Sequence, residues 1–129
     1  MKKNIEVVAA VIKKNGKFFA AQRNNKGELA RKWEFPGGKI EKGETMEEAL
    51  KRELKEELDV EVTVDKFLTT VNHEYNTFHL TLHAYECTLL SENIILKEHL
   101  DSKWLDKNSL NKVDWAAADI PIIDILRGN

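Results

Sequence analysis

Three glutamates on one predicted helix are the residues whose type and spacing most directly indicate chemistry. Segment 45–58 has helical periodicity, with apolar residues on one broad side. At about 100° per residue, Glu53 and Glu57 fall within this apolar arc, and Glu56 falls at its edge. Carboxylates are rarely buried unless they are paired or bind a metal ion. Three crowded carboxylates repel one another and favour a hard divalent cation, which prefers carboxylate oxygens.

The alternative interpretation of this helix is a solvated acidic face. Glu48, Arg52 and Glu56 are spaced four residues apart, and such oppositely charged pairs stabilise exposed helices. The segment before the helix favours the functional interpretation. Phe35–Gly38 combines a rigid proline with two glycines, which lets the backbone approach another group closely. Thr45, followed three residues later by Glu48, predicts a capping box at the helix start.

The loop and the helix together resemble the Nudix box. The matching pattern is Gly38, five residues, Glu44, seven residues, Arg52-Glu53-Leu54, one residue, and Glu56-Glu57. Several charges at fixed spacing make this pattern far more specific than a lone glycine motif. One position departs from it, because the family has glycine where this chain has Asp59. A left-handed conformation is common there, and aspartate tolerates it better than most residues, so we expect a small stability cost and unchanged chemistry.

The order of the predicted elements agrees with the fold that this resemblance implies. Strands are expected at 4–14, 18–23, 60–71, 78–88 and 103–105, a strand end at 73–76, a short extended segment at 33–35, and helices at 45–58 and 119–126. A hairpin turn at Asn15-Gly16 joins the first two strands. This order favours a mixed sheet with helices on both faces. The expected fold class is α/β, a Nudix-type α/β/α sandwich with a mixed β-sheet, formed by residues 1–129 as one domain.

Composition argues against several classes of partner. The net charge of −2 provides no general attraction to nucleic acid polymers or anionic membranes. No apolar run approaches the length of a membrane span. Cys87 is the only cysteine, so an internal disulfide is impossible, and a cytoplasmic location is expected. The oligomeric state stays open.

The resemblance implies a metal-dependent hydrolase of phosphoanhydrides. Mg²⁺ is the expected ion, with Mn²⁺ as a substitute, because Mg²⁺ keeps its waters and needs few protein oxygens. The implied metal ligands are the Gly37 or Gly38 carbonyl, Glu53, Glu56, Glu57, and Glu98 from a later loop. The implied catalytic group consists of Glu53 as a water-orienting residue or base, Arg52 as the holder of the glutamates, Glu98, and Glu44. Which glutamate is the base differs among members, and the alternative for Glu98 is an exposed loop acid.

Six residues are expected to contact the substrate, and most have a structural alternative. They are Arg23, Glu34, Phe35, Lys39, Phe78 and Asp119. The alternative is a solvated side chain for Arg23 and Lys39, and core packing for the aromatic residues, Trp115 included. Asp119 is also a good N-cap for the helix at 119–126, and we expect it to cap this helix in part. The region around Asp119 resembles the corresponding part of MutT-type and CTP-directed members, in which a side chain at this position contacts the base. A carboxylate there would accept a hydrogen bond from the amino group of cytosine or from the N–H edge of a guanine-like base.

The implied activity is hydrolysis of a nucleoside triphosphate to a nucleoside monophosphate and pyrophosphate. The 8-oxo-dGTP type and the CTP/dCTP type are equally compatible with the sequence. Either would remove oxidised or surplus nucleotides from the nucleotide pool, a role related to DNA repair. One alternative is a Nudix hydrolase of ADP-ribose or another nucleoside diphosphate derivative. Another is a binding module that has lost catalysis, for which substituted box glutamates are expected. All three glutamates are present here.

Overall fold

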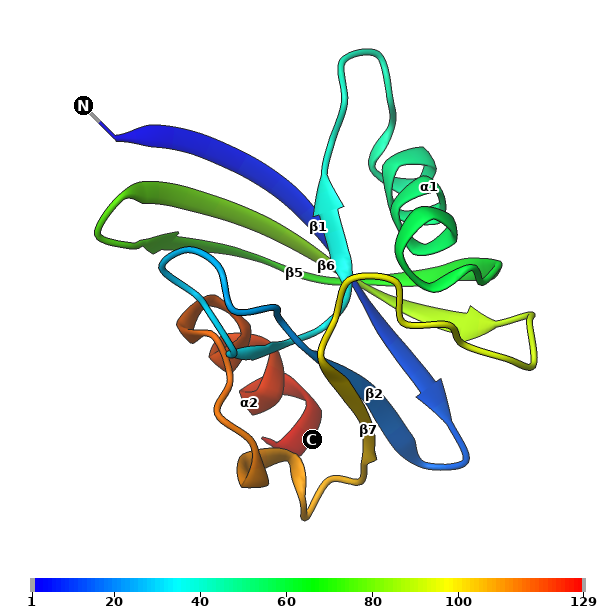
Figure 1. Ribbon diagram of the computed structural model, residues 1–129. Coiled ribbons are helices and arrows are strands. Elements are labelled where there is room, and N and C mark those ends of the chain that lie inside the picture. The colour runs from blue at the N-terminus through cyan, green and yellow to red at the C-terminus, as the bar shows by residue number, and fades with distance from the viewer. Residues whose placement is uncertain (1, 129) are drawn as a thin grey trace.

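The computed structural model describes residues 2–128, which form a mixed β-sheet flanked by two helices (Figure 1). The strands are β1 (Lys3–Lys14), β2 (Lys17–Gln22), β3 (Trp33–Glu34), β4 (Gly37–Lys39), β5 (Val62–Glu74), β6 (Phe78–Leu89) and β7 (Asp101–Leu105). The helices are α1 (Met46–Leu58) and α2 (Ile120–Gly128), with short 3-10 turns at Leu110–Lys112 and Ala117–Asp119. The main strand order is β3-β2-β1-β6-β5, with β4 paired to β1 and β7 paired to β2. Of the strand pairs within residues 2–128, β1 with β6 is the parallel one and the others are antiparallel, so the expected mixed sheet is confirmed.

Strand β1 separates two hydrophobic cores because its side chains alternate between the faces of the sheet. Val8, Ala10 and Ile12 pack in the cluster that contains the buried side of α1. Ala9 and Val11 pack in the cluster that contains the buried side of α2. Figure 1 shows the two helices on opposite sides of the strands. The predicted arrangement, with helices on both faces, is therefore confirmed.

Helix α1 begins and ends as its local sequence predicts. Thr45 Oγ1 accepts from the Glu48 amide at 3.1 Å, and Glu48 Oε1 accepts from the Thr45 amide at 2.9 Å. This reciprocal capping box satisfies two amides that the first helical turn leaves unpaired. At the other end, Asp59 adopts the left-handed conformation with φ 55°, and its carboxylate pairs with Lys55 at 3.0 Å. Aspartate thus occupies the position where the family has glycine.

Three elements differ from the expectations. Strand β4 was not predicted, because its residues Gly37–Lys39 carry no strand signal and pair with β1 only through tertiary contact. Strand β5 begins at Val62, two residues after the predicted start, and runs as one strand to Glu74, within the strand end expected at 73–76, because its hairpin with β6 continues to the pair Glu74–His79. The C-terminal helix begins at Ile120, and Asp119 belongs to the preceding 3-10 turn.

The predicted capping role of Asp119 is wrong. Its Oδ2 accepts from the backbone amide of Phe35 at 2.9 Å, 84 residues away in sequence. Among residues 2–128, no amide of the first turn of α2 donates to this carboxylate. Asp119 therefore ties the segment before α2 to the segment before β4. Within the same residues, no helix has the length and apolar character needed to cross a membrane.

Candidate functional site

A cavity of about 440 Å³ lies where β1, β4, α1 and the 3-10 turn before α2 meet. Ten of the residues predicted for the site line it: Arg23, Glu34, Phe35, Gly37, Gly38, Lys39, Glu53, Glu57, Phe78 and Asp119. Apolar residues of β1 and β6 complete its wall, among them Ile5, Val7, Leu80 and Leu82. The sheet thus brings together side chains that are up to 114 residues apart in sequence, Ile5 and Asp119. One end of the cavity is acidic and the other is mostly apolar.

The acidic end is formed by Glu53 and Glu57 of α1. Burial raises the pKa of Glu53 above its usual range, against the opposing hydrogen bond from Arg52. Burial, followed by the nearby charge of Glu53, raises the pKa of Glu57 to about 7. Glu57 Oε1 is buried and has no hydrogen-bond partner. Two partly desolvated carboxylates, one with an unsatisfied buried oxygen, fit a hard cation such as Mg²⁺.

The two motif glycines are required by close contacts, since neither has a positive φ. A Cβ added to Gly37 would lie 1.9 Å from the carbonyl oxygen of Val8 in β1. A Cβ added to Gly38 would lie 2.3 Å from the carboxyl carbon of Glu53. Gly37 therefore allows β4 to pair with β1, and Gly38 leaves room for the Glu53 carboxylate. The first is a requirement of the fold, and the second is a requirement of the site.

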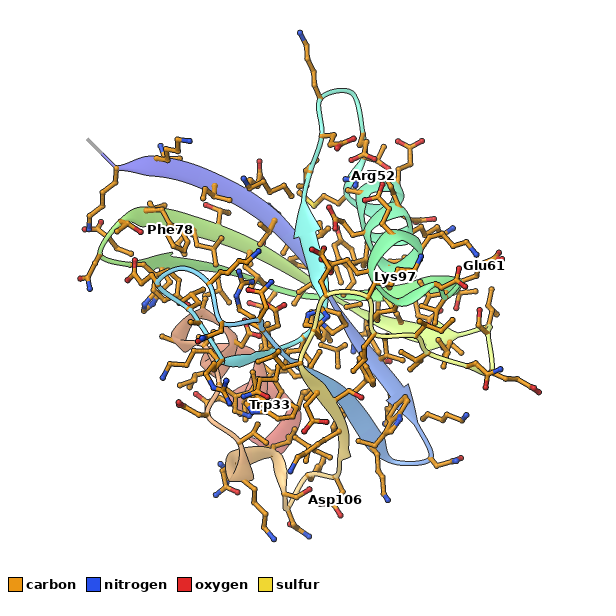
Figure 2. The ribbon with its side chains drawn as sticks, in the orientation of Figure 1. Trp33, Arg52, Glu61, Phe78, Lys97 and Asp106 are labelled. Carbon is orange, nitrogen blue, oxygen red and sulfur yellow. The ribbon has the colours of Figure 1, made fainter. Side chains whose placement is uncertain are left out.

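Arg52 of α1 lies beside the loop that precedes this helix (Figure 2). It connects that loop to the acidic end and does not itself line the cavity. Its Nε and Nη2 donate to the two oxygens of Glu44 at 2.6 and 2.9 Å. Its Nη1 donates to Glu53 and Glu56 at 3.1 Å each, and Nη2 also donates to the Lys39 carbonyl at 2.9 Å. The hydrogen bond from Arg52 holds the pKa of Glu44 below its usual value. A guanidinium that donates hydrogen bonds to three carboxylates fixes their geometry through several directed bonds.

Two predicted ligands lie outside the main cavity. The Glu56 side chain is 60% exposed and contacts Arg52. Glu98 is exposed and lines a second, polar cavity of about 190 Å³, which shares Arg23, Glu34 and Glu57 with the first. Within residues 2–128, no three His, Cys, Asp or Glu side chains converge into a ready coordination sphere. The predicted ligand set is thus gathered around one end of α1 without being preassembled.

The apolar end of the cavity contains one buried carboxyl group, that of Asp119. Burial raises the pKa of Asp119 well above its usual value. Phe35, whose amide donates to Asp119, packs against Trp115 with ring centroids 4.7 Å apart. Phe78, the first residue of β6, packs against Tyr75 with ring centroids 4.9 Å apart. Aromatic walls with one placed acceptor are typical of sites for planar ligands.

Two cationic predicted residues differ in how they are held. Arg23 Nη1 donates to Glu34 Oε1 at 3.0 Å, which fixes the guanidinium at the boundary of both cavities. Its Nε is buried without a hydrogen-bond partner. Lys39 is exposed at the rim, and only its carbonyl is engaged, by Arg52. Arg23 and Lys39 both line the main cavity, where an anionic ligand would meet their positive charges.

Sequence reasoning missed Tyr75, Glu28 and His99. The hydroxyl of Tyr75 accepts from the Ala118 amide at 2.9 Å and so supports the turn that carries Asp119. Glu28 accepts from the Asn76 and Thr77 amides at 2.8 and 3.0 Å, which holds the loop containing Leu29 against the cavity. Both contacts are long-range and have no sequence signal. The one available signal for His99 was its place directly after Glu98.

Comparison with known proteins identifies the family of this chain. The family model for the NUDIX domain matches residues 7–124. The CTP pyrophosphohydrolase of Escherichia coli K12 is 37% identical, with 95% of this chain and 90% of that protein covered. The 8-oxo-dGTP diphosphatase of the same organism is 31% identical, with 97% and 98% covered. The solution structure of a MutT protein from methicillin-resistant Staphylococcus aureus 252, described as a Nudix hydrolase, has a TM-score of 0.80 and 44% identity over 99% of this chain and 98% of that chain. The chain therefore belongs to the Nudix hydrolases, in the branch that contains MutT and CTP pyrophosphohydrolase.

Proposed function

We propose that this Nudix hydrolase is a divalent-metal-dependent nucleoside triphosphate pyrophosphohydrolase that acts in the cytoplasm and releases a nucleoside monophosphate and pyrophosphate. One observation carries the proposal: a single cavity of about 440 Å³ has Glu53 and Glu57 at one end and an aromatic, apolar compartment with Asp119 at the other. This volume is within the range of small-molecule sites. A nucleotide needs both compartments, one for its phosphates and one for its base.

At the acidic end, Glu53, Glu56, Glu57 and Glu98, together with the Gly37 or Gly38 carbonyl, would hold Mg²⁺ or Mn²⁺. When bound, the ion would neutralise charge on the phosphate oxygens and acidify a water molecule. Glu53 is our candidate to orient that water or accept its proton, because its raised pKa improves its match to a base working near neutral pH. Arg52 and Glu44 would keep Glu53 and Glu56 in position.

Between the two ends, Arg23 and Lys39 would contact the phosphates or sugar, with Glu34 fixing Arg23. At the apolar end, the base would lie against Phe78, with Phe35 behind it as a packed wall. Asp119 would accept a hydrogen bond from an N–H group of the base. The names of the two relatives, one acting on CTP and the other on 8-oxo-dGTP, suggest bases that offer such donors.

The proposed reaction is tested by a panel of nucleotides with Mg²⁺, comprising 8-oxo-dGTP, dGTP, CTP, dCTP and ADP-ribose. We expect pyrophosphate and the monophosphate from at least one triphosphate, and no turnover in excess EDTA. Chromatography of the products separates this outcome from release of inorganic phosphate. Turnover of ADP-ribose alone would replace the triphosphate proposal with the diphosphate-derivative alternative.

Replacement of Asp119 should change base preference. Asp119→Asn keeps an oxygen to accept from the Phe35 amide but adds an N–H donor toward the cavity. We expect the ratio of kcat/KM values for 8-oxo-dGTP and CTP to change by about tenfold or more, since one good base contact is worth about 1–3 kcal/mol. Asp124→Asn is the matched control, because Asp124 is exposed on α2. An unchanged ratio, together with a lower melting temperature, would assign Asp119 to structure alone.

A further inference from the structure

We propose that His99 is a positioning residue for the site, which anchors the loop that carries Glu98 so that Glu98 faces Glu57 across the smaller cavity. The inference rests on the proposed function, in which Glu98 is a metal ligand. His99 lies in the loop between β6 and β7, and its side chain is only 5% exposed, whereas its neighbours Glu98 and Leu100 are exposed. A loop side chain that is buried between exposed neighbours is inserted among groups of another element.

The buried group that contacts His99 is the carboxylate of Glu34. His99 Nε2 lies 3.0 Å from Glu34 Oε2, and because a carboxylate accepts only, Nε2 is the donor. The other oxygen of Glu34 accepts from Arg23 at 3.0 Å. Glu34 is therefore held from two sides on strand β3, with its side chain 18% exposed. Its carboxylate therefore provides a fixed attachment point for the loop.

Two backbone hydrogen bonds attach the loop on either side of His99. The Lys97 amide donates to the Glu57 carbonyl at 3.2 Å, at the end of α1, and Figure 2 shows Lys97 beside this helix. The Leu100 amide donates to the Gln22 carbonyl at 2.9 Å, at the end of β2. Among the residues that the structure describes, the bond from His99 to Glu34 is the only side-chain hydrogen bond made by residues 97–100.

This arrangement determines where Glu98 lies. Glu98 has no hydrogen-bond partner among the described residues, yet it lines the polar cavity together with Glu57, Glu34 and Arg23. Its position therefore depends on the loop backbone. Without the bond from His99 to Glu34, the loop keeps its backbone bonds at Lys97 and Leu100, with Ile95 and β7 anchoring the chain further out, but it loses the side-chain bond next to Glu98, so Glu98 gains freedom to leave the cavity. A ligand that must be ordered on binding costs affinity, and loss of a supporting hydrogen bond typically weakens metal binding 10–100-fold.

The experiment compares wild type with His99→Ala, His99→Gln, Glu98→Gln and the double variant of His99→Ala with Glu98→Gln. Binding of Mn²⁺ without nucleotide is measured by calorimetry, and kcat and KM are measured on whichever substrate the panel identifies. We expect His99→Ala to weaken Mn²⁺ binding and lower kcat by about tenfold or more, with little change in KM for the nucleotide. His99→Gln should retain most of the Mn²⁺ affinity and most of the kcat, because the glutamine amide nitrogen donates to Glu34. His79→Gln is the matched control, since His79 lines neither cavity.

The double variant gives the decisive comparison. If His99 acts through Glu98, adding His99→Ala to Glu98→Gln causes little further loss, because the two effects are coupled. Full additivity, or a lower melting temperature with unchanged Mn²⁺ affinity, would overturn the proposal. Hydrogen exchange at the Lys97 and Leu100 amides in the metal-free protein reports anchoring directly, and equal protection in wild type and His99→Ala would also overturn it. If only the triphosphate reaction fails, Mn²⁺ binding and hydrogen exchange still test the role of His99. Failure of the proposed function is therefore distinguishable from failure of the His99 proposal.

Discussion

Glu57→Gln is expected to lower kcat by about 100-fold or more while stabilising the metal-free protein. Loss of activity follows because the amide removes a negative oxygen at the acidic end of the cavity, where charge would be neutralised during phosphoanhydride hydrolysis. Stabilisation follows because Glu57 Oε1 is buried without a partner. A neutral amide of the same size avoids the cost of desolvating a charge. Activity and stability should therefore change in opposite directions at this position.

The raised pKa of Glu57 determines how the stability of the metal-free protein changes with pH. Burial raises the pKa of Glu57 to about 7 in the folded chain, from 4.5 when unfolded. The folded state therefore binds more protons between these two values, and stability falls as the pH rises through this window. The penalty is absent below pH 4.5 and complete above pH 7, where it amounts to at most about 3 kcal/mol. The stabilisation by Glu57→Gln should thus be large at pH 8 and small at pH 4.5.

The measurement is chemical denaturation in EDTA at both pH values, combined with steady-state kinetics in Mg²⁺. Glu47→Gln is the control on the same helix, since Glu47 is exposed and pairs with Lys51 at 3.1 Å. It should change neither activity nor stability appreciably. Full activity of Glu57→Gln would remove Glu57 from the proposed ligands. Lower stability of this variant at pH 8 would contradict the desolvation argument.

Adjacent glycine substitutions should have different consequences, although both introduce one methyl group. Gly37→Ala is expected to destabilise the protein by about 3 kcal/mol or more, because the new Cβ would lie 1.9 Å from the Val8 carbonyl oxygen. Neither partner is a flexible side chain, so β4 must move away from β1. The backbone hydrogen bonds between the two strands would then weaken.

Gly38→Ala should instead inactivate the enzyme and leave the fold largely intact. The new Cβ would lie 2.3 Å from the carboxyl carbon of Glu53, at the flexible end of a side chain that can rotate away. Displacing a catalytic group by about 1 Å can lower the rate about 100-fold. We expect this loss in kcat with a stability change within about 1 kcal/mol.

Thermal denaturation and kinetics of the two variants test this contrast. Gly128→Ala is the control, because a Cβ at Gly128 would meet nothing within 4 Å. Equal destabilisation by Gly37→Ala and Gly38→Ala would show that Glu53 cannot rotate away, and wild-type kcat in Gly38→Ala would argue against a catalytic position for Glu53.

The helix, its caps and its carboxylates could be predicted from sequence because each depends on residues within one or two turns. Helical periodicity placed Glu53 and Glu57 on the inner arc, and both are partly buried in the structure. It placed Glu56 at the edge, and that side chain is mostly exposed. The capping box and the left-handed Asp59 are equally local. The order of the elements follows from alternating apolar residues and from turn residues, and it was sufficient to predict a mixed sheet with helices on both faces.

Contacts between distant segments required the tertiary structure. Asp119 had a local signal for capping, but its carboxylate accepts from the Phe35 amide, because the segment before α2 packs beside β3. Pairing of β4 with β1 depends on the space left by Gly37, which a sequence pattern does not encode. The attachment of His99 to Glu34 joins residues 65 apart.

The sequence by itself therefore determined the helix with its carboxylates and the family to which they belong, since those features follow from periodicity and fixed spacing along one segment. The tertiary structure decided which carboxylates line the cavity, what the apolar end presents to a base, and how the loop with Glu98 is held. These depend on packing across the sheet, where side chains meet because strands far apart in sequence become neighbours.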